Sequence, residues 1–246
     1  MTENPFSLEG KKILITGASS GIGREIAIQT ASFGASLIIT GRNTENLNNL
    51  LKTLNHKRHK SIACDLNTSE GTSKLVSELP LLDGVIHSAG INKRLPLKYI
   101  SSQSLDEVMK INFYAPVLLT KDLYKQKLLN KEASIVFISS VASSFASLGN
   151  IMYMASKGAL NSFMKGIALE LAPFGIRANA IQPGMIKTNL TAAISDQVIE
   201  EDMKRYPLGR YGKPEEVAWA AIYLLSDATK WMSGSILTID GGLTLR

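Results

Sequence analysis

The sequence predicts one α/β domain in which a parallel sheet of about seven strands carries helices on both faces. Its 246 residues, 45% of them hydrophobic, suffice for a single sizeable core. Apolar runs of strand length alternate with stretches of helical periodicity, which is typical of a buried parallel sheet with right-handed crossovers. No linker, low-complexity tract or internal repeat marks a boundary. We therefore expect a single doubly wound, Rossmann-type domain over residues 1–246.

The strands are predicted where short continuous apolar runs occur. They lie at residues 11–16, 35–40, 61–64, 85–88, 134–139, 176–181 and 235–239. The helices are predicted from apolar side chains three and four positions apart. They lie at residues 21–33, 44–54, 105–129 and 152–171, and a last helix begins at residue 214.

Several helix ends are marked by single residues. Gly34 closes the first helix, and Pro173 ends the helix at 152–171. Pro214 opens the last helix, with two acids in the first turn, where negative charge favours the positive helix end. The stretch from 185 to 213 is polar and has no clear period, so we expect an irregular segment there.

The formal charge of +6 comes from scattered basic residues, and the one run, Lys57-Arg58-His59-Lys60, predicts a solvated turn. Such a surface favours an anionic cofactor or acyl carrier, and we expect no nucleic-acid partner. The sequence has neither a long apolar stretch nor a signal peptide at its start, so we expect a cytoplasmic protein without a membrane partner. Cys64 is the only cysteine and there are three histidines, so we expect no disulfide and no metal.

A glycine-rich turn joins the first strand to the first helix, with the spacing G-x-x-x-G-x-G. Backbone N–H groups without a neighbouring Cβ, together with the positive end of a helix, can bind a pyrophosphate. A tight turn with positive φ is the alternative, and it explains one or two of the glycines. The residues expected to contact a dinucleotide here are Gly17, Ser19, Ser20, Gly21, Ile22 and Gly23.

The end of the second strand carries Gly41 and Arg42, where NAD-binding folds usually place an acid against the ribose hydroxyls. The Arg42 guanidinium can bind a 2′-phosphate through two hydrogen bonds, and no neighbouring acid repels that group. We therefore expect NADP(H) to be preferred, with NAD(H) not excluded. A solvated arginine at a strand end is the alternative.

Tyr153 and Lys157 are four residues apart on a predicted helix, so their side chains share one face. A phenol with a pKa of about 10 is a poor acid–base group at neutral pH, and a nearby cation favours its ionised form. We therefore expect Lys157 to lower the pKa of Tyr153. Ser140 lies thirteen residues before Tyr153, at the end of a predicted strand.

This order of residues resembles the classical short-chain dehydrogenase/reductase family over nearly the whole chain. The resemblance rests on residues 16–23, Asp65, Ala89-Gly90, Asn112, Ser140, Tyr153, Lys157, Pro183-Gly184 and Thr188. It implies hydride transfer between a nicotinamide cofactor and a carbonyl or alcohol substrate.

The resemblance also implies roles for single residues. Tyr153 would give its proton to the carbonyl oxygen, Ser140 would hydrogen-bond that oxygen, and Lys157 would also hold the nicotinamide ribose. Asn112 would anchor a water that leads to Lys157. The other implied cofactor contacts are Asp65 and Leu66 at the adenine, Ala89 and Gly90 where the backbone approaches the cofactor, Pro183 and Gly184, and Ile186 and Thr188 near the carboxamide and phosphates.

Some of these residues have ordinary structural alternatives. Asp65 could cap the helix that follows it, and Asn112 inside a helix could be a surface position. The family's Asn-Asn-Ala-Gly reads His87-Ser88-Ala89-Gly90 here, so both amides are missing. His87 could be a catalytic base, but packing and hydrogen bonding are the more ordinary role of a strand histidine.

The substrate is the least determined part of the prediction. By resemblance, residues 189–213 fold over the substrate, and the motifs at 207–210 and 214–217 resemble the acyl-carrier-protein reductase branch, which points to a 3-oxoacyl thioester. Family members with the same motif act on sugars, steroids and small ketones.

The resemblance further implies a homotetramer, with a dimer as the alternative, formed through the long helices and the apolar C-terminal stretch 236–245. Two other classes are open: a catalytically silent NADP-binding regulator, and an extended relative that modifies nucleotide sugars. The intact Ser140, Tyr153 and Lys157 argue against the first class. The missing second domain and the spacing of the glycines argue against the second.

Overall fold

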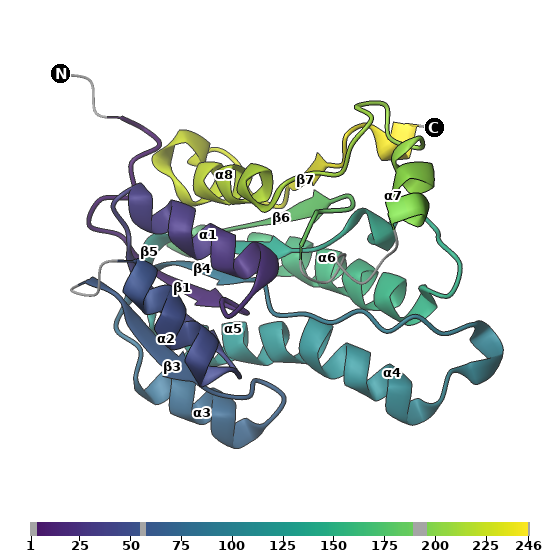
Figure 1. The fold of residues 1–246 in the computed structure, drawn as a ribbon. Coiled ribbons are helices and arrows are strands. Elements are labelled where there is room, and N and C mark those ends of the chain that lie inside the picture. Colours follow the sequence, from purple (N-terminus) through teal and green to yellow (C-terminus); the bar gives the residue numbers. More distant parts are fainter. Residues whose placement is uncertain (1–3, 55–57, 189–195, 246) are drawn as a thin grey trace.

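The computed structural model describes residues 4–54, 58–188 and 196–245. Within them, seven strands form one sheet in the order β3-β2-β1-β4-β5-β6-β7, and every neighbouring pair is parallel (Figure 1). The predicted doubly wound α/β fold is confirmed, and the strand order reverses between β1 and β4. The strands are β1 Lys12–Thr16, β2 Ser36–Gly41, β3 Lys60–Ala63, β4 Leu82–His87, β5 Leu129–Ile138, β6 Arg177–Pro183 and β7 Ile236–Ile239.

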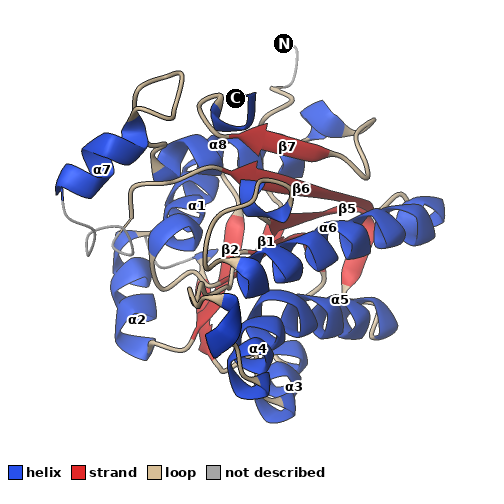
Figure 2. Cartoon of the chain, turned by 90° about the vertical axis from the view of Figure 1, so that its right-hand side faces the viewer, coloured by secondary structure: helices blue, strands red, loops and turns tan. Residues whose placement is uncertain are grey.

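Helices cover both faces of the sheet (Figures 1 and 2). One face packs against α1, α2 and α8, and the other against α3, α5 and α6. No helix in the described ranges is long and apolar enough to cross a membrane. The helices are α1 Gly21–Ser32, α2 Thr44–Thr53, α3 Ser69–Ser77, α4 Ser102–Met109, α5 Ala115–Lys125, α6 Ile151–Leu171, α7 Asp196–Met203 and α8 Pro214–Leu225.

The two cores follow the alternation of side chains along each strand. In β1, Ile13 and Ile15 belong to the core beneath α1 and α8, whereas Leu14 points into the opposite core with Leu119 of α5. All four side chains are fully buried. Each contributes about 1.5–3 kcal/mol of hydrophobic free energy relative to an exposed position. Burial on both faces explains why these strands are apolar throughout.

The predicted helix at 105–129 is wrong in its length. The structure has α4, a π-helical turn η3 (Lys110–Tyr114) and α5, which ends at Lys125. Lys127 then adopts a left-handed conformation with φ of 56°, and the chain re-enters the sheet at Leu129, earlier than predicted, by pairing with Leu82. The segment predicted to be irregular contains α7. Lys57 of the basic run and residues 189–195 lie outside the described residues.

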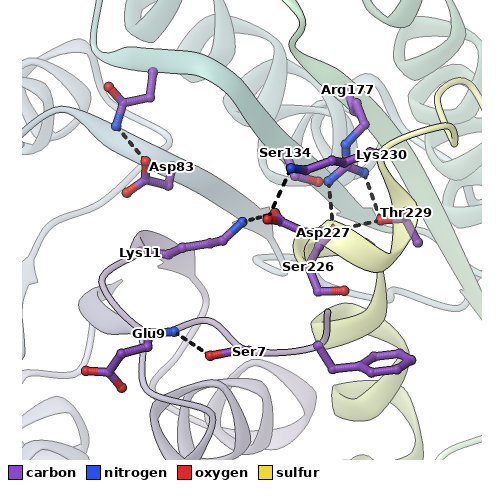
Figure 3. Close-up of polar contacts among 12 residues, drawn as sticks. Ser7, Glu9, Lys11, Asp83, Ser134, Arg177, Ser226, Asp227, Thr229 and Lys230 are labelled. Carbon is purple, nitrogen blue, oxygen red and sulfur yellow. Dashed lines mark hydrogen bonds and ion pairs between the residues drawn. The ribbon is translucent and has the colours of Figure 1, made fainter. Parts of the chain in front are cut away.

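The amino ends of the strands carry a network of paired polar groups (Figure 3). Arg177, the first residue of β6, is buried beside the carboxyl end of α8. Its guanidinium donates to the Leu224 carbonyl and the Thr229 hydroxyl, both at 3.0 Å, and to the Ser226 carbonyl at 3.3 Å. A cation at this end of a helix also satisfies the negative pole of the helix dipole.

Two carboxylates extend the network along the same edge. Asp227 pairs with Lys11 at 2.5 Å. Asp83 accepts the backbone N–H of Lys12 at 2.8 Å and the side-chain amide of Asn130 at 2.6 Å, which ties β4 to β1 and β5. These groups satisfy one another and stabilise the fold.

Candidate active site

The residues singled out by the sequence gather at the opposite edge, where the strands have their carboxyl ends. Gly17 follows β1, Arg42 follows β2, Ala89 follows β4 and Ser140 follows β5. β1 and β4 are neighbours, although the helices α1, α2 and α3 separate them in sequence. Ligands of open α/β sheets bind at this reversal of strand order, so the fold places the site there.

The glycine-rich turn is held by close backbone packing. Gly17 has φ of 67°, and a Cβ on it would lie 2.7 Å from Cα of Ala89. Gly21 has φ of 55°, and a Cβ on Gly23 would lie 2.4 Å from the Gly17 carbonyl oxygen. Backbone conformation or close packing therefore explains all three glycines, whereas the tight-turn alternative was expected to explain only one or two of them. The phosphate prediction rests instead on what the turn presents: the N-terminus of α1, with Ser20 at the N-cap position.

Thr16 joins the glycine-rich turn to the end of β4. Its hydroxyl oxygen accepts the backbone N–H of Ser88 at 3.1 Å and of Ala89 at 3.2 Å. A Cβ on Gly90 would lie 3.1 Å from Asn112 Oδ1 and 3.6 Å from Lys157 Nζ. The Ala89-Gly90 pair thus touches the glycine-rich turn on one side and the predicted catalytic residues on the other.

Arg42 is exposed just beyond β2 and has no ion pair or hydrogen bond with any described residue. Gly41, next to it, faces Ser19 of the glycine-rich turn, whose Oγ lies 3.0 Å from the place of a Gly41 Cβ. Asp65 follows the neighbouring strand and accepts the N–H of Asn67 at 3.0 Å. Thr68, and not Asp65, caps α3, so the capping alternative for Asp65 is wrong.

Ser140, Tyr153 and Lys157 are brought together. The Ser140 hydroxyl lies close enough to the Tyr153 hydroxyl to lower the pKa of that phenol by hydrogen bonding. Lys157 is buried on the same face of α6, with Nζ 5.6 Å from the centre of the Tyr153 ring. Nζ also donates to the Ile138 carbonyl at 2.7 Å, which holds the ammonium against the end of β5. The helical spacing of four residues therefore produces the predicted proximity.

The expected direction of the Tyr153 pKa is wrong. Burial raises the pKa of the Tyr153 phenol, and the hydrogen bond from Ser140 is the interaction that lowers it. Burial also lowers the pKa of Lys157 to about 8, because a desolvated ammonium is costly. At neutral pH the phenol is therefore protonated, while most of the lysine remains charged.

Asn112 lies in the π-helical turn and is buried, so the surface alternative is wrong. Its Oδ1 accepts the N–H of Ile91 at 2.8 Å, and its Nδ2 donates to the Ile91 carbonyl at 2.9 Å and to Ser156 Oγ at 3.0 Å. The amide thus clamps the chain after Gly90 onto α6. Its proposed contact with a water remains a prediction.

His87 packs inside the protein. Its ring stacks on Phe137 with centres 4.9 Å apart, and Nε2 is 2.9 Å from the Thr120 hydroxyl. Burial lowers the pKa of His87 to about 3, so the ring is neutral. These contacts favour the packing and hydrogen-bonding interpretation over a catalytic base.

The chain after β6 closes the site from another side. Gly184 follows Pro183, and its N–H donates to the Ile239 carbonyl at 2.8 Å. Ile186 is buried. The Thr188 methyl carbon lies 3.8 Å from the place of a Gly21 Cβ, so Thr188 reaches the glycine-rich turn.

Leu66 is buried in the core beside α3, so only the small exposed part of its side chain could contact an adenine. The segment predicted to cover the substrate is described only from residue 196. There, an open cleft of about 350 Å³ is lined by Phe145, Lys204, Arg205 and Leu243, which sequence analysis did not single out. Their positions depend on how α7 folds back, and no local pattern indicates that.

Known proteins share this architecture. Residues 17–244 match the family model described as enoyl-(acyl carrier protein) reductase. The chain is 32% identical over 245 residues to the 3-oxoacyl-[acyl-carrier-protein] reductase FabG of Aquifex aeolicus, covering 97% of this chain and 99% of the relative. It is 35% identical over 240 residues to the FabG of Rickettsia felis, covering 98% and 99%.

The chain belongs to the short-chain dehydrogenase/reductase family. A solved structure described as a putative NAD(P)-dependent gluconate 5-dehydrogenase from Beutenbergia cavernae, with bound NADP, superposes with a TM-score of 0.91 at 31% identity, covering 99% of this chain and 100% of that one. Membership makes this protein an oxidoreductase that interconverts carbonyl and hydroxyl groups. The relatives' names differ in substrate, so the family alone does not assign one.

Proposed function

We propose that this short-chain dehydrogenase/reductase reduces a ketone to a secondary alcohol, or oxidises the alcohol, with NADP(H) in preference to NAD(H). The observation that carries the proposal is the cluster of Ser140, Tyr153 and Lys157, because Gly90 lies beside Lys157 and the neighbouring Ala89 contacts the glycine-rich turn, so an acid–base group lies near the expected phosphate site. The nicotinamide supplies or accepts the hydride when the cofactor is bound.

The residues of the carboxyl edge fit the cofactor. Gly17 and Gly21 adopt left-handed conformations that leave the N-terminus of α1 open to a pyrophosphate. Arg42, just beyond the end of β2, has no partner among the residues that the structure describes, and a ribose 2′-phosphate there would gain two charge-assisted hydrogen bonds. Ala89, Gly90 and Thr188 lie along the same surface.

Tyr153 acts as the acid during reduction. Because burial keeps the phenol protonated at neutral pH, it has a proton to give to the carbonyl oxygen. Ser140 donates a hydrogen bond that stabilises the negative charge that develops on that oxygen. Lys157, still mostly cationic at pH 7, stabilises the phenolate that Tyr153 leaves behind.

For the substrate we propose a 3-oxoacyl thioester. The support is the likeness of residues 207–210 and 214–217 to the acyl-carrier-protein reductase branch and the names of the relatives with 32–35% identity. Arg210 of this motif pairs with Glu216 at 2.6 and 2.9 Å, so it braces the start of α8. A small ketone, a sugar or a steroid alcohol is the alternative class.

We also propose a single-domain, cytoplasmic homotetramer. β7 is the edge strand of the sheet, its residues are at least partly exposed, and the side chains of Trp231 and Leu245 near it are largely exposed. Apolar surface of this kind at a sheet edge favours burial against a second copy. Light scattering coupled to gel filtration measures the number of copies.

The test is a panel assay that follows NADPH absorbance with acetoacetyl-coenzyme A, diketones, steroids and sugars. We expect turnover with NADPH and a 3-oxoacyl thioester, and weaker turnover with NADH. Activity with NADH alone would contradict the cofactor assignment. Tight NADPH binding without turnover of any compound would instead favour a catalytically silent regulator.

A further inference from the structure

A buried amide, Gln182 of β6, lies beside the turn that follows Ser140. Its side-chain Nε2 donates to the Ser143 hydroxyl at 2.5 Å. Its Oε1 accepts the hydroxyl of Thr238, on the neighbouring strand β7, at 3.3 Å. Gln182 is 7% exposed, so both hydrogen bonds count more than they would at the surface. Neither the proposed mechanism nor the family resemblance gives this residue a role.

Ser143 closes the turn that carries Ser140. This short 3-10 turn, η4, spans Val141–Ser143, and both the N–H and the hydroxyl of Ser143 donate to the Ser140 carbonyl, at 3.0 and 2.8 Å. Inside the turn, Ser140 Oγ accepts the N–H of Ala142 at 3.1 Å. This bond uses one acceptor site of the Ser140 oxygen and does not involve the hydroxyl hydrogen, which can be donated toward Tyr153.

The hydrogen bonds run in one direction, from Thr238 to Gln182, from Gln182 to Ser143, and from Ser143 to the Ser140 carbonyl. The order fixes the amide orientation, because the hydrogen of the Ser143 hydroxyl is already given to a carbonyl and its oxygen needs a donor. A reversed amide would set two acceptors against each other. Through these hydrogen bonds, Gln182 fixes the position of the turn relative to strands β6 and β7.

We propose that Gln182 and Ser143 are positioning residues that set the angle at which Ser140 presents its hydroxyl to Tyr153 and to the substrate oxygen. The backbone before Ser140 is held by the sheet, since the N–H of Ser139 donates to the Ile181 carbonyl at 2.8 Å. The backbone after Ser140 leaves the sheet, and the Gln182–Ser143 contact ties it back. The inference rests on the proposed roles of Ser140 and Tyr153.

The experiment compares Gln182→Met, Ser143→Ala and the double variant, with Ser144→Ala as a matched control. Ser144 lies in the same turn, but its hydroxyl is 3.5 Å from its acceptor, the Val141 carbonyl. The assay uses NADPH with acetoacetyl-coenzyme A, or with the panel compound that the wild-type enzyme reduces faster. Each single variant should lower kcat about tenfold to hundredfold, because catalysis is that sensitive to small misplacements.

Three further readouts separate positioning from general destabilisation. The KM for NADPH should stay unchanged. The double variant should be no slower than the slower single variant, because both act through one contact. The apparent pKa of the catalytic acid should rise in both single variants, because Ser140 lowers the pKa of Tyr153 and would lose its alignment. Ser143→Thr, which keeps the hydroxyl, should restore most of kcat.

Wild-type kcat in Gln182→Met and Ser143→Ala would overturn the inference, and so would multiplying effects in the double variant or a lower melting temperature without a shift in the pH profile. If Gln182→Met fails to fold, Ser143→Ala and its threonine counterpart decide. Failure of the proposed function has a different signature: Tyr153→Phe would then keep full turnover. An inactive Tyr153→Phe beside a fully active Gln182→Met would reject the positioning role alone.

Discussion

The arginines at the two edges of the sheet differ in what they contact. At the amino edge, Arg177 and Asp227 are satisfied by neighbouring carbonyls, hydroxyls and ammonium groups (Figure 3). At the carboxyl edge, Arg42 has no partner among the described residues, and the buried Ser139 hydroxyl also lacks one there. The contrast separates a guanidinium that stabilises the fold, Arg177, from one that keeps its hydrogen-bonding capacity for a ligand, Arg42.

The largest effect is expected at the carboxyl edge. Tyr153→Phe removes the acid and should lower kcat by about 10²–10⁴-fold. It should shift the melting temperature by only a few degrees, because one hydroxyl is lost. Steady-state kinetics and calorimetry measure the two quantities, and Tyr223→Phe on α8 serves as the control. If Tyr153→Phe unfolded instead, Tyr153 would contribute to stability as Arg177 does, and this prediction would be wrong.

The amino edge should show the reverse pattern. Arg177→Met removes three hydrogen bonds from a buried guanidinium, although the Leu224 and Ser226 carbonyls keep other donors, so the free energy of unfolding should fall by roughly 1–3 kcal/mol. Below its melting temperature the variant should keep the wild-type kcat. Urea unfolding gives the first value and the NADPH assay the second. A large loss of kcat in folded protein would show that this edge also serves the site.

The next prediction concerns Arg42, which has no partner in the described part of the chain and which we expect to bind the 2′-phosphate of NADP(H). Arg42→Ala should raise the KM for NADPH about tenfold to hundredfold, as expected for loss of a charge-assisted pair, and leave the KM for NADH nearly unchanged. Lys52→Ala, which removes another exposed cation from α2, controls for net charge. Equal changes for both cofactors would rule out a 2′-phosphate contact.

The smallest effect concerns His87. It lies at the carboxyl end of β4 but, like Arg177 at the amino edge, it has a hydrogen-bonding partner inside the protein. Its pKa is about 3 in the folded chain and 6.5 ordinarily, so the unfolded chain takes up a proton as the pH falls below 6.5 while the folded chain does not. Stability is therefore lost on acidification, by about 1 kcal/mol between pH 7 and 5.5. His87→Gln should remove this part of the pH dependence, as measured by urea unfolding at several pH values.

The sequence predicts most of the fold because β1 and its neighbours are buried on both faces, and continuous apolar runs reveal such strands. It also predicts the approach of Tyr153 and Lys157, since one helical turn fixes that spacing. Three features depend on tertiary contacts. The π-helical turn at Asn112 has no periodic signature, β5 begins among polar residues because Leu129 pairs with Leu82, and the pKa of Tyr153 follows its burial.

The close contact between Gly17 and Ala89 has a practical consequence for altering the enzyme. A methyl group added to Gly17 would collide with the backbone of Ala89 and displace the Ala89-Gly90 pair, which lies between the glycine-rich turn and the side chains of Asn112 and Lys157. Attempts to change the cofactor preference should therefore leave the contact between Gly17 and Ala89 unchanged. Arg42 is not part of that contact, because it follows the neighbouring strand β2, and it can be exchanged without moving the catalytic residues.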